Sequence, residues 1–238
     1  SGSTFFGLKQ NIFCGAMSVS EVSWSSWLRQ AVQQQLALLL VLWRDPRFYG
    51  PMLALWFSDF GSSVSDPVRT YLNLELGFTP EDIGTLGFAN RFGTIIFSPI
   101  YGSSVDKLGI LWPLLVSIAC CGTGCSLQGV AGTMPQMMMA MVFMGLGGGC
   151  TWTMVKGYVA TQIDDSNRAL LIAGFQMQMI VLSCTSVLYP AFDGLIKWVL
   201  KTENMLLRYR AAVLFCGTTC WTGISILVFW ACRERKGK

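Results

Sequence analysis

The sequence contains no histidine and little charge. Without imidazole, zinc sites that use histidine, Ser-His-Asp catalysis and histidine pH switches are all excluded. Charged residues make up 13% of the 238 residues, about half of the roughly 25% found in ordinary soluble domains. The net charge of +4 is small and scattered, which argues against a disordered or a nucleic-acid-binding chain. With 53% hydrophobic residues, the composition indicates an integral membrane protein.

The nine cysteines indicate packing rather than disulfides or a metal site. All of them except Cys14 lie within apolar runs, where free cysteine behaves as a small hydrophobic residue. No polar loop carries a pair, and no nucleophile stands beside a base. We therefore expect no cofactor, no metal and no enzymatic activity.

Six apolar segments of nearly bilayer-spanning length follow one another along the chain. They cover about 51–74, 83–102, 111–131, 135–163, 169–192 and 211–231, with a long connection only at 195–210. The first is interrupted by Asp59, Asp66 and Arg69, and the first helical turn is expected at Pro51. The sequence therefore predicts an all-α integral membrane protein with six transmembrane helices.

Three regions are expected. Residues 1–49 form an N-terminal arm, in which the short apolar stretch 36–43 predicts an interfacial helix. Residues 50–232 form the six-helix transmembrane domain, and residues 233–238 form a basic tail. The arm lacks the basic start and short apolar core of a signal peptide.

Lysine and arginine are divided unequally between the two sides that six spans define. One side receives both termini and Lys9, Arg29, Arg44, Arg47, Lys107, Arg168 and the tail. The other side receives Lys197, Lys201, Arg208 and Arg210. We expect both termini on the cytoplasmic side, or on the equivalent side of an organelle membrane.

Three motifs lie between and within these segments. Residues 76–84 read LGFTPEDIG, where Thr79 and Pro80 suit the cap and first position of a helix. Residues 102–109 read GSSVDKLG, and residues 145–168 begin with GLGGG and end in an acidic turn and an arginine. In this order and spacing, the three motifs resemble those of the N-terminal six-helix half of a major facilitator superfamily transporter.

The resemblance implies an inner gate at the end of the second span. Gly102 and Gly109 would allow a tight reversal and a close helix approach, and Asp106 would form a charge relay with nearby basic residues. Lys107 belongs to the same motif, and Arg168 is the natural partner of Asp106. We expect these five residues to act in gating.

The chain also departs from the family pattern. Ile110 and Leu111 replace two basic residues of the gate motif, and Met141 stands where proton-coupled members often have arginine. The antiporter glycines are largely lost at 189–194. The family has twelve helices, so this chain corresponds to one half, as a half-length protein or as the first part of a longer one.

Three charged residues lie inside the predicted spans at overlapping depths, where charge is costly unless it meets a partner or water. Asp59, Arg91 and Lys156 are predicted to converge on an anion-binding site with surplus positive charge. Alternatively, Asp59 neutralises Arg91 and Lys156 extends to the interface. Asp66 and Arg69 are predicted to pair near the outer surface, and Gly147–Gly149 to allow close helix packing.

Two functions remain open. The first is a solute carrier of the major facilitator type for a small anionic solute. It would work with a second six-helix half from the same or a separate chain. The alternative is a transporter-derived, non-transporting subunit of a larger membrane complex. Both place the chain in a lipid bilayer, and neither involves nucleic acid.

Overall fold

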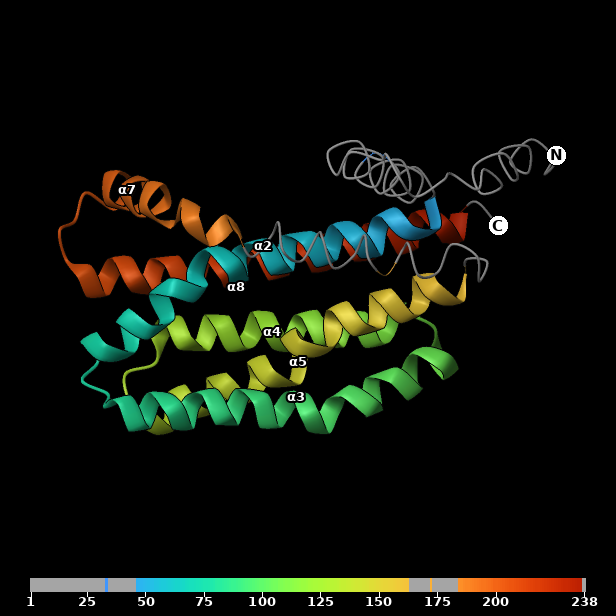
Figure 1. Cartoon of the computed structure of the whole chain (residues 1–238). Coiled ribbons are helices and arrows are strands. Elements are labelled where there is room, and N and C mark those ends of the chain that lie inside the picture. Colours follow the sequence, from blue (N-terminus) through green and yellow to red (C-terminus); the bar gives the residue numbers. More distant parts are fainter. Residues whose placement is uncertain (1–32, 34–45, 163–171, 173–183, 237–238) are drawn as a thin grey trace, which may run out of the picture.

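The chain folds into long helices in a computed structural model (Figure 1). The structure describes residues 46–162 and 184–236, together with the single residues 33 and 172. Its elements are α2 (Pro46–Glu75), α3 (Pro80–Leu108), α4 (Leu111–Val130), α5 (Met134–Thr161), the 3-10 helix η1 (Thr185–Leu188), α7 (Tyr189–Leu200) and α8 (Met205–Lys236). Within the described ranges there is no strand, as the sequence predicts. The interfacial helix, Arg168 and most of the fifth predicted span lie outside these residues.

The long helices pack side by side in one order. α2 packs along α8, α8 on α4, α4 on α5, and α5 on α3. α2 and α8 run antiparallel, since Gly50 adjoins Trp230 whereas Gly61 adjoins Thr219. The end of α2 and the start of α8 therefore lie at the same end of the bundle (Figure 1). The main apolar core lies between these helices and includes Leu55, Ile118 and Val155.

The start of α3 confirms the predicted helix cap. Thr79 is the N-cap, and Pro80 occupies the first turn. The Thr79 hydroxyl oxygen accepts from the Asp82 N–H at 3.2 Å, and Asp82 Oδ2 accepts from the Thr79 N–H at 2.9 Å. This capping box satisfies two backbone donors that would otherwise lack partners.

Several predicted boundaries are wrong. α2 begins at Pro46, which suits a first turn as Pro51 would, and Pro51 lies inside the helix. α3 continues past Gly102 to Leu108. The segment 195–210, predicted as a long connection, is helical except for 201–204. There Lys201 is left-handed at φ 48°, and Asn204 caps α8 by accepting from the Leu207 N–H at 3.1 Å.

Three of the described helices have the length and composition to span a membrane. Leu111–Val130, Met134–Thr161 and Met205–Arg233 are long and apolar enough to cross a membrane. α2 and α3 are as long, with 30 and 29 residues, but both carry several charged side chains. These charges lower the hydropathy of α2 and α3, and the two helices are not among the three.

Glycines bring the central helices into backbone contact. A Cβ at Gly145 of α5 would overlap the Asn90 carbonyl of α3, and one at Gly147 would overlap the Ser117 carbonyl of α4. The packing predicted for the 147–149 run is thus confirmed at Gly147. Gly102 is different, because a Cβ there would meet no described atom within 4 Å.

Candidate functional site

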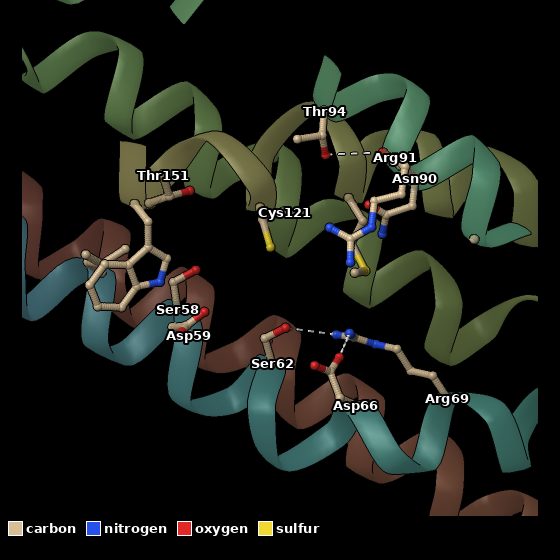
Figure 2. Close-up of a pocket in the computed structure, with 15 residues that line it drawn as sticks. Ser58, Asp59, Ser62, Asp66, Arg69, Asn90, Arg91, Thr94, Cys121 and Thr151 are labelled. Carbon is tan, nitrogen blue, oxygen red and sulfur yellow. Dashed lines mark hydrogen bonds and ion pairs between the residues drawn. The ribbon is translucent and has the colours of Figure 1, made fainter. Parts of the chain in front are cut away.

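A cavity of about 340 Å³ lies between four helices. Figure 2 shows polar side chains of α2 facing those of α3 across it. The lining residues are Leu55, Ser58, Asp59, Ser62, Asp66 and Arg69 from α2, Gly87, Asn90, Arg91 and Thr94 from α3, Cys121 from α4, and Met144, Gly148, Thr151 and Trp152 from α5. The cavity therefore gathers four charged side chains within the helix bundle.

The α2 wall is one face of a helix. Its lining positions recur at spacings of three and four residues, from Leu55 to Arg69, which places them along a single stripe. Arg69 forms an ion pair with Asp66, and its Nη2 atom donates to Ser62 Oγ at 3.4 Å. The predicted pair is therefore present.

The two partners differ in burial. The Arg69 side chain is 10% exposed, whereas the Asp66 side chain is 59% exposed. The Arg69 Nη2 atom also lies 3.6 Å from Cys125 Sγ and 3.5 Å from Cys216 Sγ. A guanidinium can be buried here because a carboxylate and several polar acceptors surround it.

The α3 wall follows the same helical spacing through Gly87, Asn90, Arg91 and Thr94. The Thr94 hydroxyl donates to the Gly145 carbonyl at 3.1 Å and fixes α3 against α5. Arg91 reaches from α3 into the space that faces α2 (Figure 2). Among the described residues, Arg91 forms no ion pair.

Asp59 lies on the opposite wall of the cavity, which Trp152 of α5 also lines. α5 also contributes Thr151, whose hydroxyl lies 3.0 Å from Ser117 Oγ of α4. Asp59 has no cation paired to it in the described ranges.

Two of the three residues predicted to bind solute line this cavity. Asp59 and Arg91 are both at its wall and form no ion pair with each other. Lys156 lies on α5 one turn beyond Trp152 and does not line the cavity. With Arg69 and Asp66 included, the lining has two acidic and two basic residues.

The predicted gating residues lie at the far end of α3. Gly109 ends the helix at φ 74°, and its N–H donates to the Val105 carbonyl at 3.0 Å. A residue with a side chain would be strained there, so the expected tight reversal is present. Asp106 and Lys107 are exposed and form no ion pair with a described residue. Arg168, the expected partner, lies outside the described residues.

Sequence reasoning missed part of this site. Ser58, Asn90 and Trp152 line the cavity but received no role, and Arg69 was assigned only to a structural pair. The spacing of Asp59, Ser62, Asp66 and Arg69 would have placed them on one polar stripe. No sequence signal shows that this stripe faces the Arg91 face of α3.

Comparison with known proteins gives one match. A family model described as Major Facilitator Superfamily matches residues 52–238. This range includes all the residues of the cavity wall. No curated protein sequence matches the chain.

Proposed function

This chain belongs to the major facilitator superfamily, and from that membership and its charged cavity we propose that it carries a small solute with an anionic group. It is an integral membrane protein of the major facilitator transporter type. The solute would bind between α2, α3 and α5, against Asp59 and Arg91.

The proposal rests on the environment of the Arg91 side chain and on its lack of an ion pair with a described residue. Its side chain is exposed toward the open cavity between the helices and forms no ion pair with a described residue. A charge in this setting is costly unless a partner or water compensates it. A carboxylate or phosphate is the complementary partner, since guanidinium binds both through two parallel hydrogen bonds.

The other charges of the cavity limit the kind of solute. Asp66 and Arg69 are paired with each other, which leaves Asp59 and Arg91 as the groups available to a ligand. A solute with a single anionic group would bind Arg91 alone. A solute that also carries an amine would contact both walls, with the amine at Asp59.

The family architecture supplies the rest of the transport path. In transporters built from two related halves, the solute binds at their interface. We propose that a second six-helix half, from the same or a separate chain, covers the open side of the cavity. Lys156 and the gate residues Gly102, Asp106, Lys107, Gly109 and Arg168 remain proposed contributors to binding and gating.

The direct test is solute binding and uptake by the purified chain. Thermal stability is measured with a panel of small carboxylates, phosphates, amino acids and amines, and the compounds that raise Tm are tested in proteoliposomes. We expect the active compounds to carry an anionic group. Arg91→Ala should abolish both the Tm shift and uptake, because it removes the guanidinium.

Arg233→Ala is the matched control, because it removes an exposed arginine outside the cavity. It should leave binding and uptake unchanged. If only amines raise Tm, or if Arg91→Ala and Arg233→Ala respond alike, the proposed role of Arg91 is wrong. Stoichiometric recovery with a large unrelated complex and no uptake would favour the non-transporting subunit instead.

A further inference from the structure

Four cysteines meet at the interface between α4 and α8. Cys121 and Cys125 are one turn apart on α4, and Cys216 and Cys220 are one turn apart on α8. The sulfur atoms of Cys125 and Cys216 are 3.2 Å apart, and those of Cys121 and Cys220 are 4.0 Å apart. The spacing on each helix therefore places two pairs of thiols across the same interface.

The closer pair also has a cation beside it. Arg69 Nη2 lies within 3.6 Å of both the Cys125 and the Cys216 sulfur. The thiolate is the nucleophilic form of cysteine, and a neighbouring guanidinium offsets part of the cost of forming it in an apolar setting. General packing of small side chains does not require this arrangement.

The pair lies beside the cavity and is separated from it by Arg69. Cys125 and Cys216 are both fully buried, but Arg69 and Cys121 line the cavity wall. Arg69 thus contacts the cavity on one side and the two sulfurs on the other. A small oxidant such as hydrogen peroxide would reach the pair after a local movement of Arg69.

The geometry points to a redox site in which Cys125 and Cys216 form a disulfide that ties α4 to α8. The structure contains both as free thiols. A disulfide requires a sulfur–sulfur distance of about 2.05 Å, so the two side chains must approach by roughly 1 Å. No group of the described cysteine, aspartate and glutamate residues has the arrangement of a metal site.

The reaction balances with peroxide as the oxidant. One thiol loses its proton and its sulfur attacks a peroxide oxygen, so that the O–O bond breaks and a sulfenic acid and water form. The second sulfur then attacks the sulfenic sulfur. The S–S bond forms, and the sulfenic oxygen leaves as water with the proton of the second thiol. The two thiols lose two electrons, which reduce the peroxide.

The test uses the purified full chain treated with hydrogen peroxide. After the remaining thiols are blocked under denaturing conditions, a nonreducing digest is analysed by mass spectrometry. We expect a linked peptide pair that joins Cys125 to Cys216 and disappears on reduction. Cys125→Ser and Cys216→Ser should each eliminate it.

The control variant replaces Cys184 and Cys232, which are both exposed, with serine. It should form the linked pair as the unmodified chain does. If peroxide oxidises only exposed cysteines, while Cys125 and Cys216 are recovered as blocked thiols, the site does not exist. A crosslink between Cys121 and Cys220 in place of the assigned pair would also overturn the proposal.

The role of Arg69 is tested separately, by the rate at which the linked pair forms. Asp66→Asn combined with Arg69→Gln removes both charges together and leaves no unpaired partner. We expect the linked pair to form severalfold more slowly in this variant, since no cation stabilises the attacking sulfur. An unchanged rate would show that Arg69 plays no part in the oxidation.

Discussion

At the scale of single residues, buried charge in this protein is compensated by specific partners. Arg208 of α8 and Asp193 of α7 form an ion pair, with side chains 10% and 20% exposed. The Arg208 Nε atom donates to Asp193 Oδ1 at 2.9 Å. Lys197 and Glu203 are 2.8 Å apart at the same end of the bundle, but both are well exposed. The two pairs differ in burial and in contacts, because Arg208 contacts both carboxylate oxygens of Asp193 whereas Lys197 contacts one oxygen of Glu203.

We predict that Asp193→Asn lowers the free energy of unfolding by about 3–5 kcal/mol, because it leaves Arg208 buried without its carboxylate. Glu203→Gln should cost less than about 1 kcal/mol, because water already screens that pair. Denaturation of the purified protein in mild detergent measures both. Equal losses would contradict this assignment of the buried pair.

Asp82 lies in the first turn of α3, before the apolar segment that the sequence predicts from about residue 83. The Thr79 backbone N–H and hydroxyl donate to its carboxylate and hold the pKa of Asp82 below its usual value. A pKa that is lower in the folded state adds stability above the unfolded pKa of about 3.9, and this is lost as the pH falls through the folded value.

Asp82→Asn should therefore reduce Tm at neutral pH, and the difference from the unmodified chain should shrink as the pH falls below about 4. Glu81→Gln is the control, because its exposed carboxylate is outside the capping box. Melting curves between neutral pH and about pH 3 provide the measurement. A difference that stays constant over this range would exclude the linkage.

At the scale of helices, contacts between glycine and backbone set the distances around the cavity. α3 and α5 meet at Asn90 and Gly145, and α4 and α5 meet at Ser117 and Gly147. The Ser117 hydroxyl donates to the Gly147 carbonyl at 2.7 Å. Small residues allow such close approach where lipid gives helices little hydrophobic reason to associate. The cavity exists because these contacts hold α3 and α5 close, with the polar face of α2 opposite.

Gly145→Ala should lower the free energy of unfolding by about 1–3 kcal/mol, because the new methyl group would overlap the Asn90 carbonyl. Gly157→Ala on the same helix should raise it by about 0.5–1 kcal/mol, because a Cβ there meets no described atom within 4 Å. Chemical denaturation of the two variants checks the opposite signs. A stabilising Gly145→Ala would show that α3 and α5 are not in backbone contact.

At the scale of the whole molecule, the turns divide the bundle into two ends. The turns after α2, α4 and α7 lie at one end, whereas the α3–α4 turn and the end of α8 lie at the other (Figure 1). Arg208 and Arg210 belong to α8 rather than to a long connection. Arg208 is paired with Asp193, and Arg210 donates to the Ala131 carbonyl at 2.9 Å. On the proposed outer side, fewer basic residues therefore lie in loops without a partner than the sequence count suggests.

We predict that an epitope tag after Lys238 is recognised by antibody only after cells are permeabilised. A tag inserted in the 201–204 turn should be recognised on intact cells if the protein lies in the plasma membrane. The excess of lysine and arginine on the terminal side favours this orientation. The reverse pattern of recognition would invert the proposed topology.

The sequence by itself determined the class of molecule, the family motifs and the local helix signals. Scarce charge and long apolar segments predict a helical membrane protein, and Thr79, Pro80 and Asp82 predict the start of α3 because a cap depends on adjacent residues. The helix boundaries near Pro51, Gly102 and 195–210 could not be predicted from the sequence, since a helix continues wherever tertiary packing supports it.

Only the tertiary structure decided which charges share a cavity. Periodicity shows which residues lie on one face of a helix, but not which neighbouring helix that face meets. Packing across α2, α3 and α5 places Asp59, Arg69 and Arg91 around one space and leaves Lys156 outside its lining. The pairing of Cys125 with Cys216 likewise depends on the contact between α4 and α8, which unites residues 91 positions apart.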